Sequence, residues 1–419
     1  MITEKVLTIA TKGLEAWGRG VNLDEILDSL SAKKENEYRS KVSSILFIYF
    51  RNKAYIDYVI DSLVTRKMEQ VIRRIISVAL VQIFYQDGVA KEIAVDVAVS
   101  YARKLRNKQA GGFVNAVLRN AIRGAFDEAR QNAPEDVKCN VPNLLLDRWS
   151  NSFSTEEKHS LTDTIKKQAP FTFRLLKSVD IDIDECKCEL IENLSWCSKF
   201  PFYRTNRPDL ILKTDLIDSG AIYIQDPATA MATCLVNSQN AKNILDICAA
   251  PGGKTLMFSE LYPNAKIVAM DCSPRRLKRV AENIERTKKD NITIVEGNAL
   301  KPPFEKNSFD IVFADVPCSN TGVIRRRPDV IWRFTQKHLD EILKLQMNIL
   351  DSSSNLVKPG GVLVYSTCSI EKDENSIQID KFLSRNKDFR FVKDRLLLPS
   401  EINDGAYAAV IKKEEKMSN

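Results

Sequence analysis

Hydrophobic and polar positions follow two different periods along this chain, and the change of period divides it into parts. From residue 3 to about residue 123, apolar residues recur at steps of three and four, as they do within 71–83, which predicts amphipathic helices. From residue 243 onward, short apolar runs alternate with helical stretches, a pattern typical of a mostly parallel sheet with helices on both faces. Residues 150–235 combine both kinds of run and predict a small α+β module.

The same pattern predicts individual elements. In the α+β module we expect strands over 171–176 and 210–212 and a short helix over 185–194. In the α/β part, the expected strands are 243–248, 266–270, 292–295, 309–316 and 361–366. Helices are expected over 275–288 and 336–357, and 406–411 predicts an added edge strand.

These patterns predict three domains. An all-α domain is expected over 1–130, a linker with the small α+β module over 131–235, and an α/β domain of Rossmann type over 236–415. The polar stretch 124–150, with two prolines, places the first boundary. A length of 419 residues supports the division, because a chain of this size exceeds what one hydrophobic core organises.

Composition narrows the class of protein. Hydrophobic content of 44% and charged content of 28% describe a soluble globular protein. The sequence contains no run of about 18 apolar residues and no signal peptide, so we expect a cytoplasmic protein without a membrane partner. Nine cysteines, an odd number without paired spacing, favour a reducing compartment. Cys186, Cys188 and Cys197 lie close together, but only two histidines and no second Cys-x-x-Cys accompany them, so no metal site is expected.

The net charge of +7 is unevenly distributed. Residues 1–140 hold 22 Lys and Arg against 17 Asp and Glu, an excess of +5, and the remaining residues hold 40 against 38, an excess of +2. A basic N-terminal part suits a polyanion such as RNA, because neutralised phosphates release counterions. A solvated helix face would show a similar excess.

The first strand of the predicted α/β sheet leads into a loop that can hold a nucleoside-like ligand. Gly252 and Gly253 let the backbone approach a ligand closely. Asp271 ends the next strand, where a carboxylate can bind ribose hydroxyls, and Asn298 can bind a base edge. The candidate cofactor-binding residues are Cys248, Ala249, Ala250, Pro251, Gly252, Gly253, Lys254, Asp271, Asn298 and Asp315. Taken alone, they fit a nicotinamide dinucleotide or S-adenosylmethionine.

Two cysteines follow the ends of two later strands. Cys318 comes after 309–316, close behind Asp315, and Cys368 comes after 361–366. Loops at the carboxyl ends of parallel strands share one crevice, so we expect both thiols beside the glycine loop. An acid beside a thiol nucleophile suits attack on a heteroaromatic ring, where a proton must be supplied as sulfur adds. Hydride transfer needs neither group, so the thiols favour S-adenosylmethionine.

Three motifs, in this order, resemble the RNA cytosine-C5 methyltransferases. They are Ala-Ala-Pro-Gly-Gly-Lys-Thr at 249–255, Asp-Val-Pro-Cys-Ser at 315–319, and Ser-Thr-Cys-Ser-Ile at 366–370 with Glu374 and Asn375. Residues 39–123 are similar to a NusB-type RNA-binding domain, which points to the RsmB (Sun) branch. The resemblance covers nearly the whole chain. It implies a NusB-like domain, the α+β linker module and a Rossmann-like class I methyltransferase domain.

The resemblance also implies a reaction, namely S-adenosylmethionine-dependent methylation of carbon 5 of a cytosine in 16S ribosomal RNA. Cys368 is then the nucleophile that adds to carbon 6, Cys318 assists release, and Asp315 holds the ring near N3 and N4. Lys254 either lowers the pKa of a neighbouring thiol or serves the cofactor carboxylate. Arg325, Arg326 and Arg327 either clamp RNA phosphates or form an exposed basic turn. We expect a monomer.

The chain departs from the family pattern at two places. Asn298 stands where an aspartate is usual, so contact with adenine differs, and Asp404-Gly405-Ala406-Tyr407 lacks one aromatic residue of the usual motif. Two alternative functions stay open, a transfer-RNA cytosine-C5 methyltransferase and a non-catalytic RNA-binding assembly factor. The helical domain argues against the first, and the intact thiols with Asp315 and Lys254 argue against the second.

Overall fold

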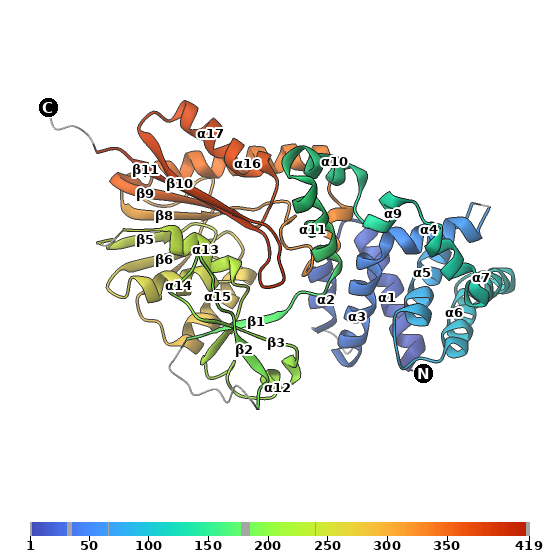
Figure 1. Ribbon diagram of the computed structural model, residues 1–419. Helices are drawn as coiled ribbons and strands as arrows, with labels where there is room; N and C mark the ends of the chain where they lie inside the picture. The colour runs from blue at the N-terminus through green and yellow to red at the C-terminus, as the bar shows by residue number, and fades with distance from the viewer. Residues whose placement is uncertain (1, 32–35, 66, 177–184, 239, 416–419) are drawn as a thin grey trace. The chain divides into compact units, whose positions relative to one another are not determined.

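The computed structural model describes residues 2–31, 36–65, 67–176, 185–238 and 240–415 (Figure 1). They form two compact units, one of Met1–Asp147 with Arg327–Arg333 and one of Arg148–Arg326 with Phe334–Asn419. The division into three domains at 130 and 235 therefore stays a prediction, while the element types predicted for each part can be compared directly.

The first unit is helical, as the period of its apolar residues predicts. Its helices are α1 (Ile2–Gly18), α2 (Leu23–Ser31), α3 (Arg39–Arg51), α4 (Lys53–Leu63), α5 (Gln70–Phe84), α6 (Lys91–Leu105), α7 (Lys108–Asn120), α8 (Phe126–Gln131) and α9 (Glu135–Cys139). The central helix is α5, in which residues on every face are buried, Ile75 and Ile76 as well as Val78 and Leu80. A helix covered on all sides needs neighbours all round it, and α1, α3, α4, α6 and α7 supply them.

A short segment from far along the chain completes this helical unit. The indole N–H of Trp332 donates to the carbonyl of Phe50 at 3.0 Å, and Asp329 accepts from the indole of Trp17 at 3.2 Å. Arg333 donates to the carbonyl of Gly20 at 3.0 Å. The sequence alone did not predict that residues from beyond 300 belong to this core.

The boundary between the two units falls within α10 (Asn143–Ser152), and in the second unit α11 (Thr155–Lys166) leads into a small antiparallel sheet. Its strands are β1 (Phe171–Leu175), β2 (Cys188–Leu190), β3 (Phe202–Thr205) and β4 (Ile222–Ile224), in the order β2-β3-β1-β4. The strand predicted over 171–176 and the α+β character of the module are confirmed.

Two element predictions in this module are wrong. Residues 210–212 lie in a helix, α12 (Pro208–Leu212), because a proline at the first helical position fixes a helical φ and has no N–H to satisfy. The helix predicted over 185–194 is instead β2 and irregular chain, since Cys188 and Leu190 pair with Thr205 and Tyr203 of β3. In both cases the apolar residues were too few to distinguish a strand from a helix.

The larger sheet has the order β10-β11-β9-β8-β5-β6-β7. Its parallel strands are β5 (Asn243–Asp246), β6 (Lys266–Asp271), β7 (Ile292–Glu296), β8 (Phe309–Asp315) and β9 (Val357–Thr367). The helices that follow these strands or flank them are α13 (Ala228–Leu235), α14 (Gly253–Leu261), α15 (Pro274–Thr287), α16 (Gln336–Ser354) and α17 (Ser376–Arg385). Separate apolar clusters cover the two faces, one with Leu350 and Phe382 and the other with Met231 and Phe258. The predicted doubly covered α/β sheet is confirmed (Figure 1).

The antiparallel end of this sheet corrects the sequence prediction. The strand expected at the edge, β11 (Ala406–Lys413), lies inside the sheet between β9 and β10 (Phe389–Leu397). Residues of β11 are buried over most of its length, whereas those of β10 are mostly exposed and include Arg390, Lys393 and Arg395. Charged residues protect a strand edge from pairing with other chains. Because the same charged residues interrupt the apolar ones, the sequence of β10 has no apolar run that would predict a strand. The helix predicted to reach 357 ends at Ser354, because Val357 begins β9.

Candidate active site

The predicted site residues converge where the order of the parallel strands reverses. From β5 the sheet continues through β6 and β7 on one side and through β8 and β9 on the other. Asp246 at the end of β5 lies opposite Phe313, and Asp315 at the end of β8 lies opposite Ser366, so the three strands end at nearly the same level. Loops that leave such strand ends enclose a crevice, which is where open α/β sheets bind their ligands.

The loop from Cys248 to Gly253 runs from β5 to α14 and is shaped by its glycines. Gly252 has a φ of 102° and stands directly before α14. A Cβ on Gly253 would lie 2.8 Å from the side-chain amide nitrogen of Gln225 and 3.1 Å from the Tyr223 ring, so a larger residue there would displace these side chains. The amide N–H groups of α14 at Gly253 and Lys254 begin the helix and are suited to bind an anionic group.

A buried acid beneath this loop was not among the predicted site residues. Asp246 is 1% exposed and accepts a hydrogen bond from the Thr255 hydroxyl at 2.6 Å. Burial raises its pKa to about 7, and its other carboxyl oxygen has no hydrogen-bond partner. With a pKa near 7, a substantial share of this acid is protonated at neutral pH, and its hydrogen bond joins the end of β5 to α14. The signal in the sequence was a single carboxylate at the end of an otherwise apolar strand.

Of the residues predicted to hold the cofactor, Asp271 and Asn298 differ most. Asp271 is buried, accepts from the backbone N–H of Ala250 at 3.3 Å, and forms an ion pair with Arg276 at 2.7 Å. It therefore lies against the glycine loop, as expected. Asn298 is exposed, and its carbonyl accepts from the backbone N–H of Leu300 at 2.9 Å, closing its own turn.

Lys254 and Asp315 form an ion pair with 2.5 Å between the ammonium nitrogen and a carboxylate oxygen. Burial lowers the pKa of Lys254, but the charge and hydrogen bond of Asp315 outweigh it, and Cys368 adds to the rise. The pKa is raised overall, so the side chain remains an ammonium ion. Of the two roles considered for Lys254, its contact with Asp315 and its coupling to Cys368 favour one near the thiols.

The two predicted thiols are in contact. The sulfur atoms of Cys318 and Cys368 are 3.2 Å apart, and they come from the loops after β8 and β9. The hydrogen bond with Cys368, and then burial, raise the pKa of Cys318 well above the usual thiol value. Cys318 therefore holds its proton in the usual pH range of a thiol and can donate it to the sulfur of Cys368.

Backbone contacts hold the loop that carries Cys318 against the loop that carries Cys368. The N–H of Gly322 donates to the carbonyl of Cys368 at 2.9 Å, and the N–H of Gly405 donates to the carbonyl of Gly322 at 2.7 Å. A Cβ on Gly322 would lie 2.5 Å from the Gly405 carbonyl oxygen. Buried Glu374 accepts from the N–H of Ser319 at 2.9 Å. Gly322 and Gly405 thus let these backbone segments approach each other as closely as the contact between the two thiols requires.

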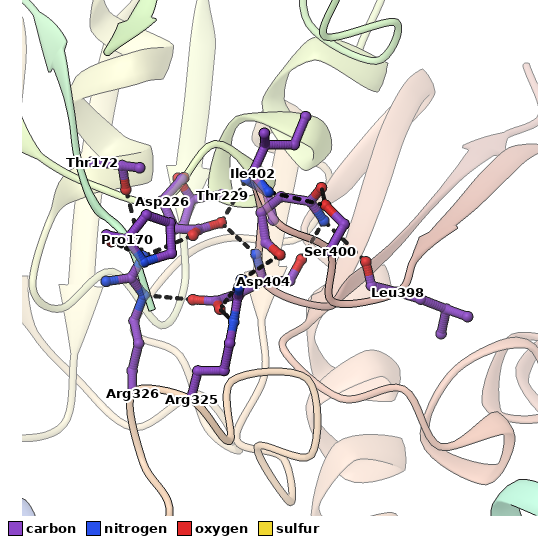
Figure 2. Close-up of polar contacts among 12 residues, drawn as sticks. Pro170, Thr172, Asp226, Thr229, Arg325, Arg326, Leu398, Ser400, Ile402 and Asp404 are labelled. Carbon is purple, nitrogen blue, oxygen red and sulfur yellow. Dashed lines mark hydrogen bonds and ion pairs between the residues drawn. The ribbon is translucent and has the colours of Figure 1, made fainter. Parts of the chain in front are cut away.

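The three arginines predicted to bind RNA do not form one cluster. Arg325 is 2% exposed and donates to Asp404 at 2.9 Å, while Arg326 bridges Asp404 and Asp226 (Figure 2). Arg327 belongs to the helical unit, where it pairs with Asp24 at 2.9 Å. Their role in binding RNA stays a prediction. The geometry gives Arg325 and Arg326 a structural task, because they join the loop after Cys318 to the segments around Asp226 and Asp404.

Burial, and then the neighbouring Asp404, raise the pKa of Asp226, while Arg326 opposes the rise. Arg326 also donates to the carbonyl of Pro170 at 3.2 Å, at the entrance to β1 (Figure 2). Beside it lies a cavity of about 550 Å³ that Lys167 and Arg204 line as well. The small sheet and the loops of the larger sheet thus meet at one buried ionic network within the second unit.

Two other features, a metal-binding cluster and a membrane-spanning helix, are absent from the described parts of the chain. No group of three or more His, Cys, Asp or Glu side chains is placed to hold a metal ion in the portion that the structure describes. No helix within the described ranges is long and apolar enough to cross a membrane.

Comparison with known proteins gives consistent matches. The family described as 16S rRNA methyltransferase RsmB/F matches residues 233–414, and the NusB family matches residues 5–123. Ribosomal RNA small subunit methyltransferase B of Cronobacter sakazakii is 30% identical over 378 residues, which are 88% of this chain and 87% of that protein. These matches confirm the predicted NusB-type domain followed by a methyltransferase domain.

Solved structures agree on the fold. The crystal structure of PH0851 covers 99% of this chain and 99% of its own, with a TM-score of 0.77 and 22% identity. The crystal structure of NSun6 from Pyrococcus horikoshii with SFG covers 66% of this chain and 99% of its own, with a TM-score of 0.56 and 20% identity. At these identities the likeness concerns the fold alone.

Proposed function

The chain belongs to the ribosomal RNA small subunit methyltransferase B family, and from this premise we propose that it methylates carbon 5 of a cytosine in 16S ribosomal RNA through a covalent cysteine adduct. The observation that carries the proposal is the contact of Cys318 and Cys368, with sulfur atoms 3.2 Å apart. Beside it lies the Lys254–Asp315 ion pair, to whose lysine Cys368 is electrostatically coupled. Methylation of an oxygen or of an exocyclic nitrogen needs no thiol pair.

The chemistry of cytosine explains why a thiol is needed. Carbon 5 is a poor nucleophile in the free ring. When the Cys368 thiolate bonds to carbon 6, the electrons of the 5,6 double bond shift and carbon 5 becomes enamine-like. Carbon 5 can then attack a methyl group on a sulfonium sulfur, whose bond to that methyl breaks and leaves the donor as a thioether. After methylation, loss of the proton on carbon 5 restores the double bond, and the bond between sulfur and carbon 6 breaks to release the Cys368 thiolate.

The residues around the thiols fit separate steps of this sequence. Cys318 keeps its proton and donates it toward the Cys368 sulfur, which stabilises the attacking thiolate. In the release step, Cys318 assists elimination of the adduct by donating its S–H proton to the departing Cys368 sulfur, or assists removal of the proton on carbon 5 as the thiolate that this donation leaves. Asp315, whose side chain is 31% exposed, holds the ring near N3 and N4, and Lys254 keeps this carboxylate in place.

The methyl donor of this reaction is S-adenosylmethionine, which supplies an electrophilic methyl group when it is bound. The residues present fit it. Gly252, with a φ of 102°, turns the chain into α14, whose first N–H groups suit an anionic group, Asp271 lies against the loop to receive ribose hydroxyls, and Asn298 follows the next strand. The Asn298 amide closes its own turn, so we expect it to contribute less to binding than Asp271 does.

The nucleic-acid partner follows from the first unit and from the family. A NusB-type domain over residues 5–123, in a part of the chain with a charge excess of +5, supports binding of ribosomal RNA. An unstacked base in a loop is the substrate that costs least to insert into the crevice. A cytoplasmic location and a monomeric state stay predictions, and a transfer-RNA substrate is the alternative that the test must exclude.

The proposal is tested by trapping the covalent adduct. Cys318→Ala should still attack and methylate, then stall, so a complex with 16S ribosomal RNA should survive denaturing electrophoresis. Cys368→Ala and the double variant should neither trap RNA nor methylate it, while Cys234→Ala serves as a control that behaves like the wild type. Transfer RNA is included as a competing substrate.

Each other outcome has a defined meaning. Trapping by Cys368→Ala alone would assign the nucleophile to Cys318. Full activity of both single variants would remove covalent catalysis from the proposal, and preferential methylation of transfer RNA would overturn the ribosomal substrate. A protein that binds RNA without methylating either RNA in any form would be an assembly factor.

A further inference from the structure

The side chain of Asn320 touches both cysteines. Its carbonyl oxygen accepts a hydrogen bond from the sulfur of Cys368 at 3.1 Å, and its amide nitrogen donates to the backbone carbonyl of Cys318 at 2.9 Å. The second bond decides which end of the amide faces which partner, because only the NH₂ group can donate to a carbonyl. The oxygen therefore faces the Cys368 thiol.

Asn320 reaches this position through an unusual backbone conformation. Its φ is 60°, in the left-handed region, which asparagine enters more readily than other residues except glycine. Two residues further along, Gly322 donates to the Cys368 carbonyl. The chain from Cys318 to Gly322 therefore surrounds Cys368, with contacts to its sulfur from Cys318 and Asn320 and to its carbonyl from Gly322.

These contacts act on the Cys368 proton in opposite directions. The S–H of Cys318, on the loop after β8, and the ammonium group of Lys254, on α14, both favour the thiolate. The carboxylates of Asp315 and of Glu374, in the turn before α17, disfavour it. The Asn320 oxygen also favours the neutral thiol, because an acceptor can bind the S–H but only repels a sulfur anion.

We propose that Asn320 is a positioning residue that holds the Cys368 thiol protonated and oriented in the resting enzyme. This inference rests on the proposed function, in which Cys368 is the nucleophile. When Cys368 loses its proton to solvent, the 3.1 Å contact with the amide oxygen changes from attractive to repulsive. Ionisation therefore moves the Cys368 sulfur away from Asn320. Asn320 thus stabilises the protonated thiol in its resting position and disfavours a thiolate in that position.

The test is the pH dependence of alkylation of Cys368 in the full-length protein, measured with iodoacetamide and without RNA or cofactor. Peptide mass spectrometry reads Cys368 separately from the other cysteines. The quantity compared is the midpoint, the pH at which the alkylation rate of Cys368 is half its maximum. In Asn320→Gly, which retains the left-handed backbone, this midpoint should fall by about half to one pH unit. In Asn320→Asp, which keeps the acceptor and adds a negative charge, the midpoint should rise.

The matched control is Asn307→Gly, the same substitution at a φ of 55° in a turn before β8. It should leave the Cys368 midpoint unchanged. Thermal unfolding of all three variants shows whether they remain folded, and a purely structural role of Asn320 would lower the unfolding temperature without moving the midpoint. An unchanged midpoint in folded Asn320→Gly overturns the inference. A raised midpoint also overturns it, since it would mean that the amide donates to the thiolate.

Failure of this inference can be distinguished from failure of the proposed function. If Cys368→Ala abolishes methylation while the midpoint of Asn320→Gly stays unchanged, only the role of Asn320 is wrong. The opposite outcome is a midpoint that shifts as expected in Asn320→Gly together with a Cys368→Ala variant that still methylates RNA. In that case the hydrogen bond acts on the thiol as proposed, but the thiol is not the nucleophile and the proposed function fails.

Discussion

The second unit contains two pairs of cysteines in contact, and they differ in what surrounds them. The sulfur atoms of Cys318 and Cys368 are 3.2 Å apart, and those of Cys197 and Cys234 are 3.0 Å apart. In both pairs the hydrogen bond raises the pKa of one thiol, Cys318 in the first and Cys234 in the second. Distance and mutual hydrogen bonding therefore do not distinguish them.

The surroundings do distinguish them. Cys197 is 5% exposed and packs with Ile191, Leu194 and Phe200 in an apolar cluster, next to α13, which carries Cys234. The first pair follows the carboxyl ends of β8 and β9, near the Lys254–Asp315 ion pair and in contact with Asn320. Two adjacent thiols become a candidate catalytic pair where a crevice at strand ends and an ion pair of a cation with an acid accompany them. The second pair has Lys199 as a charged neighbour but lies in an apolar cluster, where the same contact serves packing.

The largest expected effect separates the two pairs by activity. Cys368→Ser should reduce methyl transfer by about 1,000-fold or more, because a hydroxyl at this position does not supply a comparable nucleophile. Cys234→Ser should leave the rate within about threefold of the wild type, because its pair lies in an apolar cluster. Methyl transfer to 16S ribosomal RNA measures both. A large loss in Cys234→Ser with an intact fold would break the comparison.

The second largest effect on methyl transfer is expected from loss of the positive charge of Lys254. Lys254→Gln should reduce methyl transfer by about 10- to 100-fold, because the variant loses the positive charge that favours the Cys368 thiolate and that holds Asp315. The midpoint for alkylation of Cys368 should rise in the same variant, whereas alkylation of Cys197 should not change. If both cysteines responded alike, Lys254 would act on the whole fold and not on one thiol.

Stability should follow the opposite order from activity. Cys197→Ala removes a buried sulfur from a packed cluster and should lower the free energy of unfolding by about 1–2 kcal/mol. Cys368→Ala removes a partly exposed sulfur and should cost less, about 0.5 kcal/mol. Urea denaturation at pH 7 measures both values. A larger loss in Cys368→Ala would mean that the first pair also serves packing.

The smallest effect is a pH dependence of the second pair. The hydrogen bond from Cys234 lowers the pKa of Cys197, although burial opposes this shift. A group whose pKa is lower in the folded state adds stability above its unfolded pKa and loses it as pH falls through the folded pKa. The stability difference between the wild type and Cys197→Ala should therefore increase from pH 6.5 to pH 8.5, by up to about 1 kcal/mol. Urea denaturation at the two pH values measures it, and a difference that decreases would contradict the assignment.

Much of the fold and the centre of the site could be predicted because they depend on local patterns. The parallel strands were apparent as apolar runs, and parallel strands present their carboxyl ends on one side of a sheet. This rule was enough to expect Cys318, Cys368, Lys254 and Asp315 in one crevice before any distance was known. The helical unit was predictable for the same reason, since its apolar positions recur with the period of a helix.

Contacts between distant positions were not predictable from patterns. Arg326 pairs with Asp226 across 100 residues of sequence, and Arg325 with Asp404 across 79, so a basic run that suggested RNA contacts contributes two side chains to a buried network. No sequence pattern distinguishes Asn320, although its side-chain oxygen lies 3.1 Å from the Cys368 sulfur.

The sequence by itself determined most of the helices and parallel strands and which chemical groups stand at their ends, because hydrophobic period and turn residues act over a few positions. Only the tertiary structure decided which side chains face each other, and therefore that Cys318 keeps its proton. It also decided that Asp246 is buried beneath the glycine loop and that Arg327–Arg333 belongs to the helical unit. The physical reason is that burial and hydrogen bonding set the pKa and the role of a side chain, and both depend on residues that the chain brings together only when it folds.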